Sequence, residues 1–388
     1  MFRKPAFIKA KIKVLLAGGG SGGHIYPLIA VSEELINTAY NEGIDLTLDY
    51  LGPIDPRVKN EFEIIGIQPH SLLTGKLRRY ASLVILLDIP AFFISIFQAL
   101  FKVWLIMPNV LFSKGGTGAL PVVLACRFYR IPVMIHESDA VPGTTNYISG
   151  RHFSKAIGVS FQKAASYFDP AKTAVVGNPI RSALLYKRPE QPNAKTLIGL
   201  DPQKPVMFIV GGSLGSQRLN DFIIDNLKNI LSVTQVIHQT GDKNFDDIKE
   251  KIKSLFGDEI QAQKSGYVFF PFLNENLKTA YSAADIVVSR AGAGAIFEAA
   301  SFGKPIILIP LPEAANDHQR ENAYEFAQAG GGIVIEEDNL LPDIFIEQIN
   351  VIIGNPEKAK QMSEASFKFF IPGAAEALAK EIIKITGN

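Results

Sequence analysis

A glycine-rich segment near the N-terminus has the residue types of a phosphate-binding turn. The segment Gly18–His24 has glycine at five of its first six positions, and it lies between an apolar run at 12–17 and helical apolar spacing at 27–37. Glycine lets the backbone adopt positive φ and approach a ligand closely, and the N-terminus of the following helix offers N–H groups to an anion. We therefore predict that this turn contacts a phosphate group, with Pro27 in the first helical turn.

The glycine turn is also compatible with two other interpretations. Three of its glycines fit the G-x-G-x-x-G pattern of NAD-binding turns, with Asp45 or Asp49 as the acid that holds a ribose. His24, which we place just before the helix, argues against this interpretation, because a dinucleotide turn favours a small residue at that position. The second alternative is a turn that needs its glycines only for packing.

Two later segments repeat the order strand, small-residue turn, helix. The first of these turns, 211–216, follows an apolar run at 206–210 and places Ser213 at the expected N-cap. The second, 289–298, ends in Glu298, which we expect in the first helical turn. A carboxylate there can accept both hydroxyls of a ribose, but it can also merely complement the helix dipole. Its position in the sequence does not decide between these two roles.

Short apolar runs alternate with helical segments in both halves of the chain. This order predicts an α/β protein with two doubly wound domains, each a parallel sheet covered by helices on both faces. The segment 187–205 holds four prolines and little periodicity, which indicates a linker. A final helix at 373–385 could pack on either half. The expected strands are 12–17, 45–51, 110–113, 132–136, 174–176, 206–210, 233–239, 267–270, 286–289 and 306–310.

Length and composition narrow the class of protein. A chain of 388 residues suggests two or three domains, and 47% hydrophobic against 20% charged residues excludes wholesale disorder. The formal net charge of +1 gives no global electrostatic case for binding nucleic acid. The single cysteine, Cys126, excludes an internal disulfide and fits a reducing compartment. Because the apolar run at 14–17 is too short for a signal peptide, we expect the protein to stay in the cytoplasm.

Six motifs occur in one order along positions 12–323, and together they resemble the MurG family of glycosyltransferases. They are Gly18–Pro27, His136–Asn146, Gly177–Arg181, Gly211–Asn220, Arg290–Pro310 and Asp317–Ala323. The resemblance implies the GT-B fold, in which two Rossmann-like domains face each other across a cleft. It implies an N-terminal domain at 1–180 that faces acceptor and membrane, and a C-terminal domain at 181–372 that binds UDP-GlcNAc. The helix at 373–388 could pack back on the first domain.

The family's reaction transfers N-acetylglucosamine (GlcNAc) from UDP-GlcNAc to the C4 hydroxyl of N-acetylmuramic acid (MurNAc) in undecaprenyl-pyrophosphoryl-MurNAc-pentapeptide, called lipid I. The resemblance implies that this chain does the same, with inversion to a β linkage, and makes lipid II for peptidoglycan. It also implies UDP-GlcNAc and lipid I as binding partners, and a cell-wall synthesis complex as a further partner.

The resemblance implies a substrate site built from residues of both halves. Arg181 holds nucleotide groups, Leu273 contacts uracil through its backbone, and Ser213 contacts phosphate. Glu298 holds the ribose diol, and Gln319 reaches the GlcNAc hydroxyls. The full set of implied substrate-binding residues is Ser21, Gly22, Gly23, Asp139, Arg181, Ser213, Leu273, Ala293, Gly294, Ala295, Ile296, Phe297, Glu298 and Gln319.

Two of these positions depart from the family's usual pattern. The family often has Asn where Asp139 stands, and an ionised carboxylate accepts hydrogen bonds but does not donate them. A hydroxyl residue is common where Ala295 stands, so this chain lacks one side-chain contact to the diphosphate and retains the backbone N–H groups. We expect both contacts to differ in character from those of the family.

His24 is the candidate catalytic base. An imidazole can accept a proton near neutral pH, although His24 could instead only hydrogen-bond phosphate or substrate, and Glu137 is a weaker candidate for the base. The chain has no aspartate pair at D-x-D spacing, which metal-dependent UDP-sugar transferases typically use. We therefore expect helix N-termini, glycine-loop amides and Arg181 to stabilise the departing UDP, with no protein-bound metal and no cofactor.

One apolar segment is suited to contact with a membrane. Residues 81–101 are almost wholly apolar, and basic residues flank them on both sides. Asp88 would cost about 2.5–3.5 kcal/mol at the centre of a bilayer, and Pro90 is expected to break the segment, which argues against a transmembrane helix. We predict that 76–102 binds the cytoplasmic side of the cell membrane peripherally. A buried core helix is the alternative.

Three other functions are open at this point. A GT-B transferase with a different lipid or small-molecule acceptor would share the fold and the donor. An NAD-dependent oxidoreductase would bind NADH and ignore UDP-GlcNAc. A catalytically inactive module would bind UDP-GlcNAc and release no UDP with any acceptor.

Overall fold

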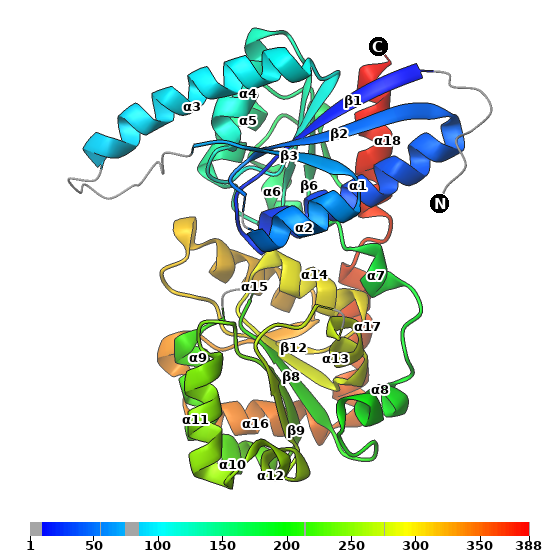
Figure 1. Cartoon of the computed structure of the whole chain (residues 1–388). Helices are drawn as coiled ribbons and strands as arrows, with labels where there is room; N and C mark the ends of the chain where they lie inside the picture. The colour runs from blue at the N-terminus through cyan, green and yellow to red at the C-terminus, as the bar shows by residue number, and fades with distance from the viewer. Residues whose placement is uncertain (1–9, 55, 74–84, 213–214, 275, 388) are drawn as a thin grey trace. The chain divides into compact units, whose positions relative to one another are not determined.

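The fold comes from a computed structural model that describes residues 10–54, 56–73, 85–212, 215–274 and 276–387. The chain divides into an N-terminal unit, Met1–Ser182 with Ile371–Asn388, and a C-terminal unit, Ala183–Phe370 (Figure 1). Each unit contains one parallel sheet flanked by helices. The prediction of two doubly wound α/β domains is confirmed.

The N-terminal sheet has seven parallel strands in the order β3-β2-β1-β4-β5-β6-β7. In central β1, Val14 pairs with Leu48 of β2 on one side and Val110 of β4 on the other. The strand order reverses between β1 and β4, and ligands of open α/β sheets bind beside such a reversal, beyond the carboxyl ends of the strands. The strands are β1 (Ala10–Ala17), β2 (Ile44–Gly52), β3 (Ile67–Ser71), β4 (Val110–Ser113), β5 (Val133–Glu137), β6 (Ala156–Val159) and β7 (Thr173–Val175).

The helices of the N-terminal unit include the last helix of the chain. Leu378, Ile382 and Ile385 form an apolar stripe at helical spacing, and they join Val14 and Leu28 in one buried core. The last helix thereby packs along the first. These helices are α1 (Gly22–Glu42), α2 (Pro56–Ile64), α3 (Ile85–Ile106), α4 (Ala119–Phe128), α5 (Thr144–His152), α6 (Gln162–Ala165), the 3₁₀ turn η1 (Pro170–Lys172) and α18 (Ala374–Thr386).

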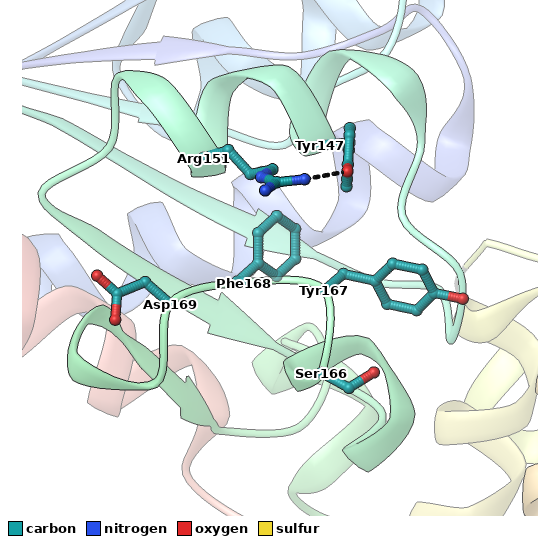
Figure 2. A pocket seen from close by; sticks show the side chains of 6 residues that line it. All are labelled: Tyr147, Arg151, Ser166, Tyr167, Phe168 and Asp169. Atoms are coloured by element: carbon teal, nitrogen blue, oxygen red, sulfur yellow. Dashed lines mark hydrogen bonds between the residues drawn. The ribbon is translucent and has the colours of Figure 1, made fainter.

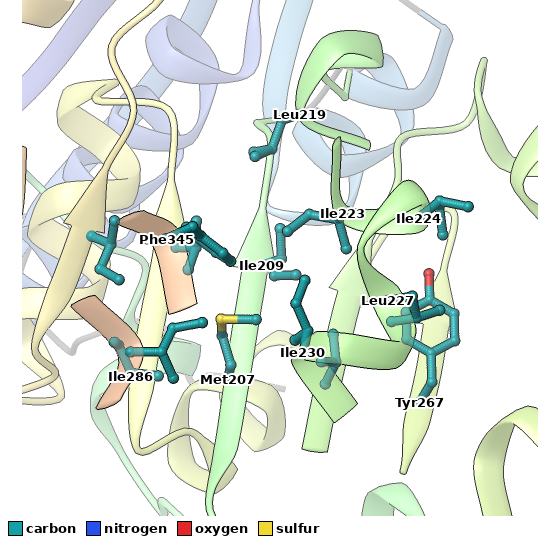
Figure 3. Close-up of a cluster of buried hydrophobic side chains, with 14 of the residues drawn as sticks. Met207, Ile209, Leu219, Ile223, Ile224, Leu227, Ile230, Tyr267, Ile286 and Phe345 are labelled. Carbon is teal, nitrogen blue, oxygen red and sulfur yellow. The ribbon is translucent and has the colours of Figure 1, made fainter. Parts of the chain in front are cut away.

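The C-terminal sheet has six parallel strands in the order β10-β9-β8-β11-β12-β13. Met207 and Ile209 alternate along β8 and therefore face the same side of the sheet. Ile223, Ile230 and Phe345 from the covering helices share a buried cluster with them (Figure 3). The strands are β8 (Val206–Val210), β9 (Gln235–Gln239), β10 (Tyr267–Phe270), β11 (Ile286–Ser289), β12 (Ile306–Leu308) and β13 (Gly332–Val334).

The covering helices of the C-terminal sheet come from the whole span between its strands. α7 spans the boundary between the units. The elements are α7 (Ser182–Leu185), α8 (Gln191–Ile198), α9 (Gln217–Asp225), α10 (Leu227–Leu231), α11 (Phe245–Phe256), α12 (Glu259–Lys264), α13 (Leu277–Ala283), α14 (Ala293–Ser301), η2 (Ala315–Asp317), α15 (His318–Gln328), η3 (Glu337–Asn339), α16 (Pro342–Ile353) and α17 (Pro356–Phe369).

Two expectations about proline were wrong. Helix α1 begins at Gly22, so Pro27 is its sixth residue and lies beyond the first turn. Helix α3 continues through Pro90 and is not broken there. A proline removes the single hydrogen bond that its own N–H would make to the carbonyl four residues earlier, and the rest of each helix is retained.

The proline-rich segment 187–205 is not a plain linker. It contains α8, which has Pro192 in its first turn, where no N–H donor is needed. Helix α8 packs against α13, so the segment belongs to the C-terminal unit. The ten expected strands all form, with ends within two residues of the predicted ones, while β3, β6 and β13 were not anticipated.

Candidate functional site

The first glycine turn joins the end of β1 to the start of α1. Ser21 is the N-cap of α1, and its hydroxyl hydrogen-bonds His24 Nδ1 at 2.8 Å instead of capping a backbone N–H. His24 therefore lies within the first helical turn, not before the helix as expected. The predicted residues Ser21, Gly22, Gly23 and His24 thus surround the N-terminus of one long helix, where an anion is favoured.

A second turn, after β4, lies against the His24 ring. Gly115 and Gly116 have φ of +74° and +83°, a conformation that favours glycine. A Cβ on Gly116 would lie 2.9 Å from His24 Nε2 and 2.8 Å from the backbone of Gly19. The imidazole is therefore packed against this turn, and only glycine permits so close an approach.

A buried polar network lies directly behind that turn. Lys114 is 2% exposed, and its ammonium donates hydrogen bonds to His136 Nδ1 and to Ser138 Oγ, both at 2.5 Å. His136 Nε2 in turn donates to the Gly177 carbonyl at 2.9 Å, and Ser138 donates to Asn178 Oδ1 at 2.9 Å. Burial and the neighbouring Lys114 charge lower the pKa of His136 well below its usual value, so this ring is neutral. The network joins the loops that follow β4, β5 and β7.

Glu137 holds the loop that follows β5. Its buried carboxylate accepts hydrogen bonds from the N–H groups of Asp139 (3.0 Å) and Gly143 (3.1 Å) and from Asn146 Nδ2 (3.0 Å). Burial raises the pKa of Glu137 above its usual range, and burial lowers that of Lys114. Because both carboxylate oxygens already accept these hydrogen bonds, the geometry favours a positioning role for Glu137 over a role as catalytic base. Asp139 follows it on the same loop, half-buried.

Arg181 lies beside α1 in the N-terminal unit. Its guanidinium carbon is 4.1 Å from the centre of the Tyr26 ring, within the range of a cation–π contact. Tyr26 comes two residues after His24 in the same helix. The structure therefore brings Arg181 to the helix that carries Ser21–His24, although the two segments are far apart in sequence.

The third small-residue turn, predicted at 289–298, leads into α14 in the C-terminal unit. Gly292 is the N-cap and Ala293 the first residue, so Glu298 is the sixth residue and lies in the second turn. The expectation that it lies in the first turn was wrong, because the turn between β11 and α14 is shorter than assumed. The helix-dipole explanation weakens accordingly, since that effect fades beyond the first turn. Glu298 Oε2 instead accepts a hydrogen bond from the Tyr281 hydroxyl at 3.2 Å.

The other predicted residues of this loop differ in what they can offer a ligand. Gly294 and Ala295 are half-buried, and Ala293 is buried at the helix start. Ile296 and Phe297 are fully buried members of the core. Only the backbone of these last two residues is suited to a ligand contact.

Leu273 is connected to the second glycine turn by a residue that the sequence analysis missed. Gln239, at the carboxyl end of β9, is buried, and its Oε1 accepts the N–H of Leu273 at 3.0 Å. Its Nε2 donates to the Gly212 carbonyl at 3.3 Å. Because the N–H of Leu273 is already hydrogen-bonded, its carbonyl is the backbone group that would make the predicted contact to uracil. Ser213, predicted on this turn, lies outside the described residues. The N-cap of α9 is Ser216, so the prediction that Ser213 is the N-cap was wrong.

Arg290 and Gln319 complete the candidate site of the C-terminal unit. Arg290 is buried, donates to Ser216 Oγ at 2.9 Å and pairs with Glu337, so it ties the second glycine turn to the loop before α14. Gln319 lies in α15, and its Oε1 accepts the N–H of Leu311 at 2.9 Å. The side-chain amide nitrogen of Gln319 is therefore the group that can donate a hydrogen bond to a sugar hydroxyl. An arginine directly after the apolar run at 286–289 was the sequence signal that could have identified Arg290.

Comparison with known proteins identifies the family. The glycosyltransferase family 28 N-terminal domain matches residues 14–157, and the C-terminal domain of that family matches residues 206–378. A relative from Clostridium tetani is 34% identical over 372 residues, which cover 95% of this chain and 98% of the relative. Its name is UDP-N-acetylglucosamine–N-acetylmuramyl-(pentapeptide) pyrophosphoryl-undecaprenol N-acetylglucosamine transferase. The chain belongs to the MurG family.

Other MurG-family proteins agree over the same extent. A relative of the same name from Legionella pneumophila strain Paris is 35% identical and covers 92% of this chain and 94% of its own length. The crystal structure of Acinetobacter baumannii MurG matches with a TM-score of 0.70 at 24% identity, covering 96% of this chain and 99% of that one. This match confirms the predicted GT-B fold. Membership of the MurG family decides against the NAD interpretation of the first glycine turn.

The predicted MurG-family residues are divided between the two units. The N-terminal group consists of Ser21, Gly22, Gly23, His24, Asp139 and Arg181, and the C-terminal group of Leu273, Ala293–Glu298 and Gln319. Within each unit these residues follow the carboxyl ends of strands, as ligand-contacting residues do in open α/β sheets. Their contacts to substrate stay a prediction.

Proposed function

We propose that this member of the MurG family transfers GlcNAc from UDP-GlcNAc to the C4 hydroxyl of MurNAc in lipid I, with inversion, and so forms lipid II. The observation that carries the proposal is the alignment of relatives named for this transfer over 95% of the chain, across both units. The position of His24 between two glycine turns supports it further.

The proposal gives the two units different substrates. The C-terminal unit binds the donor, with Glu298 on the ribose diol, the Leu273 carbonyl at uracil and the amides at the start of α14 at phosphate. The N-terminal unit binds the acceptor beside His24. Ser213 is expected to contact phosphate as well.

The chemistry needs one base and relief of charge on the leaving group. His24 takes the proton of the C4 hydroxyl, the resulting oxygen attacks the anomeric carbon, and UDP leaves from the opposite face. In this proposal His24 Nδ1–H donates to the Ser21 hydroxyl, which fixes the ring orientation and leaves the unprotonated Nε2 as the nitrogen that accepts the proton. Helix N-termini and Arg181 stabilise the negative charge that develops on UDP.

Helix α3 supports peripheral binding to a membrane as part of the same proposal. Ser95, Ala99 and Val103 form its buried stripe, and α3 packs against α4. Other faces carry large apolar side chains open to solvent, including Phe97 at 70% and Trp104 at 55% exposure. These exposures contradict the alternative of a wholly buried core helix. None of the helices in the described part of the chain is long and apolar enough to cross a bilayer.

An exposed apolar surface of this extent is characteristic of an interaction site. Because the acceptor carries an undecaprenyl chain in the proposal, we infer that α3 inserts its exposed face into the headgroup region on the cytoplasmic side of the cell membrane. The basic flank at 76–79 lies outside the described residues, while Lys102 is on the helix itself. Membership of a cell-wall synthesis complex stays a prediction.

One assay tests the proposed reaction. The protein is incubated with UDP-GlcNAc and a short-chain lipid I analogue, and UDP release and disaccharide product are measured. We expect both products from the wild type, a loss of turnover in His24→Ala, and normal turnover in His152→Ala, a surface histidine of the same unit. UDP release only with a different acceptor would favour the other GT-B function, and binding of UDP-GlcNAc without UDP release would indicate an inactive module.

A further inference from the structure

A pocket in the N-terminal unit has no role in the function described so far. It has a volume of about 470 Å³, within the range of small-molecule sites. Figure 2 shows its six lining residues, from helix α5 and from the segment that follows α6. They are Tyr147, Arg151, Ser166, Tyr167, Phe168 and Asp169.

The pocket lies beneath helix α5, and the Tyr147 end of that helix is the end nearer the candidate catalytic turn. Helix α5 follows β5 and the segment 166–169 follows β6, and the strand order runs β1-β4-β5-β6. Adjacent strands are about 4.8 Å apart, so a ligand that starts beside β1 and β4 reaches the pocket by extending past one or two strands and along α5.

Helix α5 connects the pocket to the candidate catalytic turn directly. The Thr145 hydroxyl, in its first turn, donates to the Gly116 carbonyl at 3.2 Å, and Gly116 is the residue packed against His24. Tyr147 and Arg151 follow on the same helix. At a rise of 1.5 Å per residue, Arg151 is about 9 Å along the axis from Thr145.

The pocket walls are held in place by close contacts. A Cβ on Gly150 would lie 2.5 Å from the Phe168 ring, so the glycine lets this buried ring pack directly beneath α5. The Arg151 guanidinium lies 5.3 Å from the centre of the Tyr147 ring and donates a hydrogen bond to its hydroxyl. The arginine is thereby oriented before any ligand arrives.

The charges in the pocket favour a ligand that carries a carboxylate. Within the described ranges, no acidic side chain forms an ion pair with Arg151, which is exposed. The other charged lining residue is Asp169. Its Oδ1 already accepts the Ala171 N–H at 3.0 Å, and its Oδ2 lies 4.0 Å from Lys172 Nζ. A guanidinium binds a carboxylate with two parallel hydrogen bonds, and aromatic rings beside it suit peptide and sugar surfaces.

We propose that this pocket binds the peptide arm of the acceptor, with Arg151 paired to a peptide carboxylate and Tyr147 and Tyr167 in contact with the chain beside it. The inference rests on the proposed function, in which the acceptor carries a pentapeptide. Five extended residues span about 17 Å, which covers the distance from the candidate catalytic turn along α5. The pocket then selects acceptors by their peptide.

The test compares Arg151→Met with Arg127→Met, an exposed arginine in the last turn of the neighbouring helix α4. Each variant is assayed with a lipid I analogue that carries the pentapeptide and with one that lacks it. For Arg151→Met we expect a KM for the peptide-bearing acceptor about ten-fold higher or more, as for a lost charged hydrogen bond. We expect unchanged kcat, an unchanged KM for UDP-GlcNAc and no effect with the peptide-free acceptor. Arg127→Met should behave as the wild type.

A direct binding measurement separates this inference from the proposed function. Soluble MurNAc-pentapeptide is titrated into the wild type and into Arg151→Met by calorimetry, and we expect binding to weaken by the same factor. Equal KM changes for both acceptors, or no change in either experiment, would overturn the peptide assignment even if the wild type makes lipid II. If Arg151→Met does not fold, Tyr167→Ala, on the opposite wall, replaces it with the same expected outcomes. Absence of transfer in the wild type with peptide binding intact would count against the proposed reaction alone.

Discussion

The turn after β4 allows a sharp test of the His24 assignment, through the substitution Gly116→Ala. The new Cβ would lie 2.9 Å from His24 Nε2, about 0.5 Å closer than the 3.4 Å at which ordinary contact begins. The turn itself is strained as well, because a residue with a Cβ at φ of +83° costs about 1–2 kcal/mol. The imidazole must therefore move by about half an ångström or the turn must shift with it.

Gly66→Ala is the matched control for that substitution. Gly66 lies in the same unit with φ of +82°, and a Cβ there would meet nothing within 4 Å. Both variants should lose about 1–2 kcal/mol of unfolding free energy from backbone strain, measured by urea denaturation. Gly116→Ala should lose more, because its Cβ would also lie 2.8 Å from the backbone of Gly19. Only Gly116→Ala should lose turnover, by about ten-fold or more, because a misplacement of about 1 Å at a reacting group can cost a hundred-fold.

The measurement is kcat with UDP-GlcNAc and a short-chain lipid I analogue, expressed per folded molecule. The Kd for UDP-GlcNAc should not change in either variant, since Glu298, Leu273 and the amides at the start of α14, which bind the donor in the proposal, lie in the other unit. Turnover of Gly116→Ala within two-fold of that of Gly66→Ala would refute the claim that this turn positions the catalytic base.

Four further results are expected. Glu298→Ala should weaken UDP-GlcNAc binding by about 1–3 kcal/mol by calorimetry, whereas Glu347→Ala, on an exposed face of α16, should not; equal affinities would remove the ribose assignment. Gln239→Leu should raise the Kd for UDP-GlcNAc without lowering kcat at saturating donor, because Leu273 and Gly212 lose their common partner; an unchanged Kd would contradict the bridge. The double variant Phe97→Ser with Trp104→Ser should reduce sedimentation with anionic vesicles, because each ring contributes up to about 1.5–3 kcal/mol to membrane binding when it is buried. Phe367→Ser, which removes an exposed ring of the C-terminal unit, should have no effect. Burial lowers the pKa of His238 to about 3, so the unfolded chain takes up a proton below about pH 6.5 that the folded chain does not. The free energy of unfolding should therefore fall as the pH is lowered below about 6.5. Between pH 7.5 and pH 5, His238→Gln should lose about 2 kcal/mol less unfolding free energy than the wild type, measured by urea titration.

The strands and their order along the chain could be predicted because they depend on local pattern. Val206–Val210 is an apolar β-branched run between turn residues, and it forms β8 with the predicted ends. Three strands were missed because they are short or carry polar residues; β3, for example, contains Gln68, Pro69 and His70. The helix starts were less accurate, since small residues such as Ala293 are compatible with either a turn or a helix.

The loops of the candidate site could be located from sequence, but the groups that hold them could not. Lys114 and His136 are 22 positions apart, and Gln239 and Leu273 are 34 apart. Their contacts depend on the order of strands in the sheet, which brings the ends of β4 and β5, and of β9 and β10, together. A single sequence shows a lysine and a glutamine after apolar runs, and no local rule distinguishes them from surface residues.

The return of α18 to the N-terminal unit affects how this protein can be made. On the ribosome, the unit that contains His24 lacks Leu378, Ile382 and Ile385 until the whole of the intervening unit has been synthesised. A nascent chain stopped before position 371 would therefore expose the apolar side of α1 to water and to chaperones. Expression of the first 182 residues alone should give an aggregating fragment, whereas residues 183–370 contain every strand and helix of their own sheet.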